Sequence, residues 1–153
     1  MKPLLTLAAV FACAFPTVAA PTGRVKIYVV ALGDNGKIGK KIGCGDSLVS
    51  VSRFITPTSA PLTGAIRQLL KEPHNSQSLP HLGNYWVGPG LKLKSVSVKG
   101  GLAAIRFTGH VAVAGVCDEP RIEEQIEATA RQFPTVKRVQ VWVGNEKLAD
   151  AIR

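Results

Sequence analysis

The feature that most constrains this chain is a pair of cysteines, Cys44 and Cys117, that lie far apart in the sequence. Cys44 lies between two glycines in residues 42–48, and Cys117 precedes a dense charge cluster in residues 115–121. A bond between them would close a loop of about 73 residues, which on the chain-entropy model stabilises a fold by roughly 4 kcal/mol. Whether the bond forms depends on the compartment in which the protein folds.

The first twenty residues have the properties of a secretory signal peptide. Met1-Lys2 is a short basic start, residues 4–15 form an apolar run too short to span a bilayer, and residues 18–20 supply small side chains of the kind that signal peptidase accepts. We predict that residues 1–20 are removed and that the protein is exported to the periplasm, the cell envelope or the medium. No later stretch is apolar and long enough to cross a membrane.

Two other interpretations of this segment stay open. A buried N-terminal helix is disfavoured because Pro3, Pro16 and Pro21 bracket the apolar run. Lipidation at Cys13 would make the protein a lipoprotein, but the bulky Phe11 and the very short preceding apolar run argue against that signal. We favour a cleaved signal peptide over both.

Cysteine use agrees with export. Without Cys13 the exported domain holds two cysteines, which is the pattern for one disulfide. A zinc site is the rival use, but neither cysteine has another cysteine or a histidine within four residues, whereas zinc sites use closely spaced ligand pairs. We predict a Cys44–Cys117 disulfide, no metal site and no cofactor.

Charge is unevenly distributed along the chain. The full sequence carries 19 Lys and Arg against 10 Asp and Glu, and the excess is concentrated before residue 107. A basic surface attracts polyanions, which outside the cytoplasm are cell-wall polymers, lipid headgroups or stray nucleic acid. A surface that only keeps the protein soluble is the alternative.

The periodicity of apolar residues predicts a mixed fold. The predicted strands cover residues 25–32, 47–55, 94–98, 102–108 and 139–143, and the predicted helices follow Pro61 and Asp118 and end before Pro73 and Pro134. This order indicates an α+β fold with a mostly antiparallel sheet of about five strands and two helices packed on one face. We assign the domain to residues 24–145 and a short C-terminal tail to residues 146–153.

Local signals refine this outline. Ser59 and Asp118 are expected to cap the two helices, and Gly100-Gly101 predicts a tight hairpin turn. Residues 74–93 have no clean period and carry Tyr85-Trp86. Such a long irregular segment is often functional, so the aromatic pair is either a binding platform or a plug over the edge of the core. We favour the plug and keep both residues as binding candidates.

A disulfide would also bring charged side chains together. Asp46 and Arg53 follow one bridged turn, and Asp118 and Arg121 follow the other, so we expect the four to share one neighbourhood. They would form either a polar patch that recognises an envelope partner or an ion-pair network that holds the turns. We prefer the network and name the four residues as candidate binding residues.

Catalysis has little support in the sequence. Asp46, Ser47, His74, His81 and His110 are residue types that a hydrolase could use, but no Gly-x-Ser-x-Gly turn frames the serine and the histidines lack paired spacing. A nucleic-acid binder would need a basic stripe with interleaved aromatic residues, which the sequence also lacks. We predict neither an enzyme nor a specific nucleic-acid partner.

Several of these segments together resemble the GerMN domain, a family named from spore-germination and sporulation proteins. They are residues 26–28, 43–49, 65–70, 91–107, 115–122, 125–133 and 139–143. The resemblance covers nearly the whole chain after the signal peptide. The two cysteine motifs are similar to an exported subgroup of the family.

The resemblance implies an extracytoplasmic binding domain. GerMN domains are often found on lipoproteins or beside cell-wall-binding and amidase modules, and they are similar to the ring-building domains of sporulation channels. We therefore predict an exported, non-catalytic module that binds an envelope protein or an anionic cell-wall polymer. The alternative is an exported hydrolase or accessory factor acting on cell-wall polymers. A single copy without a partner module leaves a sporulation or germination role open.

Overall fold

The computed structural model of the protein describes residues 23–75 and 81–153. The predicted signal peptide, residues 1–20, and the lipidation site considered at Cys13 lie outside the described residues. In the described part of the chain, no helix is both long and apolar enough to cross a membrane.

Eight strands and three α-helices make up the described chain. They are β1 (Arg24–Ala31), β2 (Lys40–Lys41), β3 (Ser47–Phe54), α1 (Pro61–Leu69), β4 (Leu82–Gly83), β5 (Lys92–Lys99), β6 (Leu102–Thr108), α2 (Asp118–Arg131), β7 (Arg138–Val143), β8 (Glu146–Lys147) and α3 (Leu148–Ala151). A short 3₁₀ turn, η1 (Gly43–Gly45), precedes β3. The predicted strands and the two main helices are all present.

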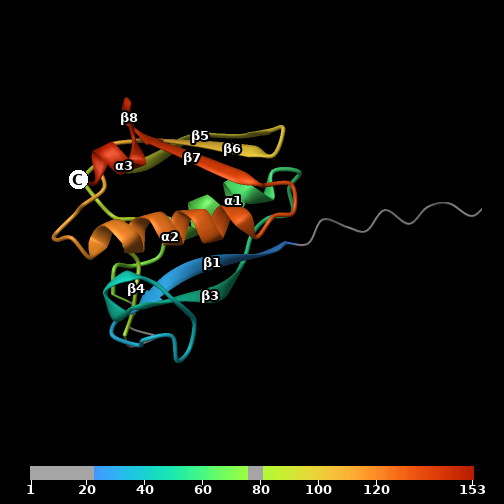
Figure 1. The fold of residues 1–153 in the computed structure, drawn as a ribbon. Helices are drawn as coiled ribbons and strands as arrows, with labels where there is room; N and C mark the ends of the chain where they lie inside the picture. The colour runs from blue at the N-terminus through green and yellow to red at the C-terminus, as the bar shows by residue number, and fades with distance from the viewer. Residues whose placement is uncertain (1–22, 76–80) are drawn as a thin grey trace, which may run out of the picture.

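The strands form two four-stranded sheets, in the orders β2-β3-β1-β4 and β5-β6-β7-β8. All pairs are antiparallel except β6 with β7, which run parallel. Figure 1 shows α1 and α2 as a layer between the two sheets. The α+β class and the mostly antiparallel pairing are confirmed, but the strands divide into two sheets where we expected one. Alternation indicates which side of a strand is buried and does not indicate its neighbours.

The core lies between these layers. In β1, Val25, Ile27 and Val29 are buried on alternate positions, and in β6 Ala103, Ile105 and Phe107 are fully buried. The buried faces of the two main helices meet these strands, with Leu62, Ala65, Ile66 and Leu69 on α1 and Ile122, Ile126 and Ala130 on α2. Both helices predicted from the apolar periodicity therefore pack through an apolar face.

The predicted hairpin turn is also confirmed. Gly100 and Gly101 join β5 to β6 with φ values of 54° and 76°. Two successive residues with positive φ match the twist of the flanking strands, and glycine adopts that conformation without a steric penalty.

Polar side chains of α2, and of Gln132 directly after it, bond the backbone of β1 along the part of its edge that β4 does not pair. The backbone of Lys26 exchanges two hydrogen bonds with the Gln132 amide, at 2.8 Å and 2.6 Å. The Tyr28 N–H donates to Thr129 Oγ1 at 3.2 Å, and Gln125 Nε2 donates to the Tyr28 carbonyl at 2.8 Å. Because these side chains stand where another strand would bond, they fix α2 along β1. The start of α2 is thereby placed beside the loop that follows β1.

The predicted helix caps are wrong in both cases. The residue before α1 is Ala60, which makes no side-chain cap, so Ser59 does not cap the helix. The residue before α2 is Cys117, and Asp118 is already the first helical residue. The Asp118 carboxylate instead accepts a hydrogen bond from the N–H of Ala114, four residues earlier in the chain, at 2.8 Å. Pro61 does occupy the first position of α1, where its missing N–H costs nothing.

The last eight residues contribute to the core. β8 pairs antiparallel with the end of β7, and α3 follows it directly. Leu148 and Ile152 are buried against the main cluster. The segment predicted as a short tail thus closes one end of the layer that contains α1 and α2.

Candidate functional site

The predicted disulfide is present and joins the two cysteine turns. Cys44 and Cys117 are bonded, with Cα atoms 5.8 Å apart. Cys44 lies in the η1 turn with φ of 60°, and Cys117 lies immediately before α2. A Cβ atom added to Gly43 would come within 3.0 Å of the Pro120 ring, so the turn packs directly on the helix start. The bond therefore fastens the loop after β1 to the N-terminus of α2.

A buried ion-pair cluster lies beside the disulfide. Arg121 Nε donates to Asp46 Oδ2 at 2.6 Å, and Arg121 Nη1 donates to Asp118 Oδ1 at 3.0 Å. The side chains of Asp46, Asp118 and Arg121 are 2%, 10% and 16% exposed. The second oxygens are also bonded, because Asp46 Oδ1 accepts from the Gly33 N–H at 2.9 Å and Asp118 Oδ2 accepts from Ala114. Three of the four charged residues predicted to meet are thus brought together.

The environment of Arg121 strengthens its positive charge. Burial works to lower the pKa of the guanidinium, but the hydrogen bond to Asp46 and the nearby negative groups outweigh it, so the pKa is raised above its ordinary value. All carboxylate oxygens of the cluster accept hydrogen bonds, so it has the properties of a structural network that holds the two turns.

The two aromatic candidates, Tyr85 and Trp86, contact different neighbours. Tyr85 lies next to the cluster, with the Arg121 guanidinium 4.9 Å from its ring centroid and the His74 ring packed edge-on at 5.2 Å. Burial raises the pKa of the Tyr85 phenol above its ordinary value. Trp86 is 1% exposed, stacks on Phe107 and donates from Nε1 to the Ile122 carbonyl at 2.9 Å. Both aromatic residues are therefore buried in the core, and Tyr85, at 7% exposed, also lines a hollow beside the cluster.

A hollow of about 470 Å³ opens over this cluster. Its walls come from the segment after α1 and from the connector before α2, and its lining residues are His74, Tyr85, Val87, Ala112, Val113, Ala114, Asp118 and Arg121. His74 Nδ1 lies 2.8 Å from the Asn84 carbonyl oxygen, so that ring nitrogen carries the hydrogen. The hollow is thus lined by aromatic and apolar side chains together with Asp118 and Arg121, which already bond each other.

The expectation that Arg53 joins this cluster is wrong. Arg53 lies near the far end of β3, opposite Val25 of β1. Since a strand rises about 3.4 Å per residue, Arg53 stands about 20 Å from Ser47 at the bridged turn. It forms a bidentate pair with Glu72 instead, at 2.6 Å and 2.8 Å, and this hydrogen bonding raises its pKa.

Asp34 and Ser47 bond each other and order the loop between β1 and β3, a pairing that the sequence did not predict. Ser47 Oγ donates to Asp34 Oδ2 at 2.6 Å and accepts from the Gly36 N–H at 2.6 Å. The bond from Ser47, together with the Ile38 N–H, lowers the pKa of the Asp34 carboxyl below its ordinary value. The available signal was an aspartate in a glycine-rich loop, where its side chain commonly bonds backbone amides. Ser47 therefore orders the loop here.

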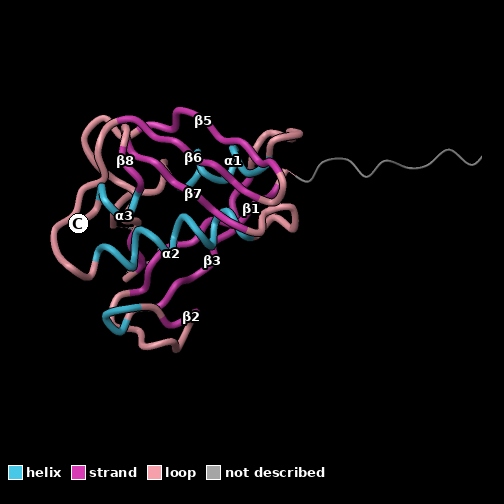
Figure 2. Tube along the Cα trace, turned by 45° about the horizontal axis from the view of Figure 1, so that its top comes forward, coloured by secondary structure: helices cyan, strands magenta, loops and turns pink. Residues whose placement is uncertain are grey.

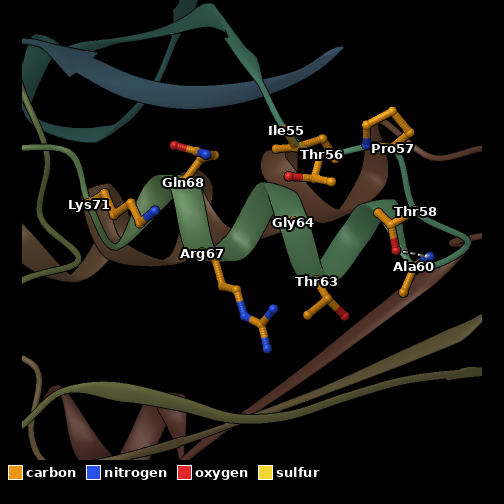
Figure 3. A pocket seen from close by; sticks show the side chains of 10 residues that line it. All are labelled: Ile55, Thr56, Pro57, Thr58, Ala60, Thr63, Gly64, Arg67, Gln68 and Lys71. Atoms are coloured by element: carbon orange, nitrogen blue, oxygen red, sulfur yellow. Dashed lines mark hydrogen bonds between the residues drawn. The ribbon is translucent and has the colours of Figure 1, made fainter. Parts of the chain in front are cut away.

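A second hollow, of about 430 Å³, lies between the end of β3 and α1 (Figure 3). Its lining residues are Ile55, Thr56, Pro57, Thr58, Ala60, Thr63, Gly64, Arg67, Gln68 and Lys71. A bond from the Ala60 N–H to Thr58 Oγ1 at 3.1 Å shapes one rim. Sequence reasoning missed this groove, and the only available signal was the i, i+4 spacing of Arg67 and Lys71 on the exposed side of the helix.

Together the fold and the cross-link define a class: a small disulfide-locked α+β module whose two sheets enclose two helices. Residues 26–149 match the family model described as Germane: Sporulation and spore germination. Because this match covers most of the sequence, the chain belongs to the Germane, or GerMN, family. None of the curated proteins matches the chain.

Two solved structures share the fold. The first GerMN domain of the sporulation protein GerM from Bacillus subtilis is 16% identical, with a TM-score of 0.59, and the match covers 82% of this chain and 86% of that domain. The tandem GerMN domains of the same protein are 18% identical, with a TM-score of 0.56 and 88% of this chain covered. This chain spans 43% of that tandem structure. At such identities the likeness shows the fold alone.

Proposed function

We propose that this protein is an exported, non-catalytic binding module that attaches to a component of the cell envelope. The observation that carries the proposal is the Cys44–Cys117 disulfide. Disulfides of this kind persist in oxidising compartments and are rare in the cytosol, where thiols are kept reduced. The bond agrees with the signal peptide predicted for residues 1–20, which is the sequence basis for export.

Binding is favoured over catalysis because of how the reactive side chains are engaged. Asp46 and Asp118 both bond Arg121, and the Ser47 hydroxyl donates to Asp34. A nucleophilic serine needs a base that accepts its proton at neutral pH, and the Asp34 carboxylate has a lowered pKa that makes it a poor base. These groups stabilise loops, and the proposal assigns them no chemical step.

Charge favours an anionic partner. The full chain carries a formal net charge of +9, which becomes +8 when Lys2 leaves with the predicted signal peptide. Ion pairs among the described residues use only five of the Lys and Arg side chains. The other cations in residues 23–75 and 81–153 form no ion pair there and can attract polyanions over a distance set by the ionic strength. The partner we propose is an anionic cell-wall polymer.

Sedimentation with purified cell-wall material tests the proposal. The exported protein should pellet with the insoluble wall fraction at low salt, and its release by rising salt should be gradual. The same incubation should liberate no soluble wall fragments. Protein that stays in the supernatant at low salt would reject binding, and fragment release that depends on the protein would reject the non-catalytic assignment.

A further inference from the structure

The outer face of the sheet β5-β6-β7-β8 is strongly basic. Ala103, Ile105 and Phe107 of β6 point into the core, so the alternate residues of β6 point outward, and the pairing registers extend this face to the other strands. Its charged members are Lys92, Lys99, Arg106, Arg138 and Lys147, and no carboxylate shares the face. In Figure 2 this sheet is turned toward the viewer.

These cations are exposed and have no local counter-charge. Lys92, Lys99, Arg106 and Arg138 are all exposed. Within residues 23–75 and 81–153, no carboxylate lies within ion-pair distance of any of them. The cluster around Arg121 differs, because each of its charges is already bonded. A surface with uncompensated charge gains more from an external anion than one whose charges are paired.

Arg106 and Trp142 form the centre of this face. The two residues lie side by side on the parallel pair β6 and β7, and the guanidinium of Arg106 is 4.2 Å from the Trp142 ring centroid. Stacking holds the planar guanidinium in place while its N–H donors stay free at the edge. A positioned guanidinium can bond two oxygens of a phosphate at once.

The spacing of the cations fits an extended ligand. Arg138 and Trp142 are four residues apart on β7, so the cation row of Lys99 and Arg138 lies about 13 Å from the row of Arg106 and Lys147. The positions between the rows carry the short or uncharged side chains Ser97, Ala104 and Gln140. A small anion would reach one row, whereas a linear polymer can lie across both.

We infer that the outer face of the sheet β5-β6-β7-β8 binds a linear, phosphate-bearing polymer of the cell wall, with Arg106 as its anchor. This inference rests on the proposed function and names the surface and the chemistry of its ligand. A single-stranded nucleic acid is the competing polyanion. Nucleic-acid sites add several aromatic platforms for successive bases, and this face carries one tryptophan.

Tryptophan fluorescence tests the location of the site. The chain has two tryptophans, and Trp86 is buried in the core while Trp142 lies on the proposed face. Long-chain polyphosphate and a phosphodiester-linked wall polymer should each change the emission in a saturable way, and uncharged dextran should not. Trp142→Phe should abolish the change. Polymer binding without any change in emission, or single-stranded DNA binding more tightly than both phosphate polymers at equal salt, would overturn the inference.

A pair of charge-matched variants tests the residues. Arg106→Gln, Arg138→Gln and Lys147→Gln combined should weaken polyphosphate binding about 30-fold at moderate salt, because each exposed ion pair contributes up to about fivefold. The salt dependence of log K should fall by about two to three in slope. This face variant should unfold at the same urea concentration as the parent, since the three side chains are exposed.

The control variant removes the same charge elsewhere. Lys37→Gln, Lys41→Gln and Lys71→Gln combined should change the affinity for polyphosphate less than about threefold, since these exposed lysines lie outside the face. If both variants lost affinity for polyphosphate equally, net charge alone would explain the binding and the proposed face would be rejected.

Wall sedimentation separates failure of this inference from failure of the proposed function. If the face variant still pellets with the wall fraction as the parent does, the surface is wrong and envelope binding stands. If the parent itself does not pellet, the proposed function fails.

Discussion

The disulfide-linked end of the molecule and the outer face of the sheet β5-β6-β7-β8 use charge in opposite ways. At the linked end, Asp46, Asp118 and Arg121 are buried and bond one another. On the sheet, Arg106 and Arg138 are exposed, with no carboxylate in ion-pair distance among the described residues. The difference teaches that the charged residues most conspicuous in the sequence, those flanking the cysteines, stabilise the fold. The charges available to a partner lie on β5, β6, β7 and β8, away from the cysteine turns.

The largest effect should follow from removing the disulfide. Replacing Cys44 and Cys117 by Ser should lower the free energy of unfolding by about 4 kcal/mol, because the unfolded chain regains the entropy of a long loop. Urea unfolding followed by circular dichroism measures this. An unchanged midpoint would show that the bond does not stabilise the fold. Polyphosphate binding by the variant, measured where it is still folded, should match the parent.

A smaller loss should follow from breaking the buried cluster. Arg121→Ala leaves the Asp46 carboxylate buried without its cation, which should cost about 3 kcal/mol in the same urea experiment. Arg131→Ala is the matched control, because Arg131 pairs with Glu127 at an exposed helical position. That change should cost less than about 0.5 kcal/mol. Equal costs for the two variants would contradict a structural network at the linked end.

Arg53→Ala should lower the free energy of unfolding by less than Arg121→Ala does. Its bidentate pair with Glu72 is partly exposed, so the loss should be about 1 kcal/mol. Because Arg53 stands away from both compared regions, envelope and polyphosphate binding should be unchanged. A loss of binding in a folded Arg53→Ala protein would place the partner at the far end of β3 and not on the proposed face.

The smallest effect concerns acid stability. Since the pKa of Asp34 is lowered in the folded protein, its ionised form stabilises the fold above the unfolded pKa, and this contribution disappears as the pH falls through the native pKa. Asp34→Asn should therefore flatten the dependence of the unfolding free energy on pH below about pH 4. Identical acid slopes for variant and parent would show that the bond from Ser47 does not stabilise the carboxylate.

Much of the fold could be predicted because it depends on local patterns. The hairpin followed from Gly100-Gly101, and the buried faces of α1 and α2 followed from their helical spacing. The disulfide followed from counting cysteines once Cys13 was assigned to the signal peptide. These inferences need only neighbouring residues or residue types.

What could not be predicted depends on pairing between distant strands. Nothing in the sequence places β1 and β6 in separate sheets, and the parallel pair of β6 with β7 alone brings Arg106 beside Trp142. Arg53 was grouped with the cysteine turns because it follows Cys44 closely in sequence, although an extended strand carries it away. The candidate binding face is therefore visible only once the register is known.

The division between a stabilising end and a binding face is tested most directly by one comparison of polyphosphate affinity. Arg121→Ala and the combined Arg106→Gln, Arg138→Gln and Lys147→Gln variant should be titrated at a temperature where both are fully folded. We predict that Arg121→Ala binds as the parent does and that the face variant binds about 30-fold more weakly. The reverse result, with binding lost in folded Arg121→Ala and kept in the face variant, would contradict this division.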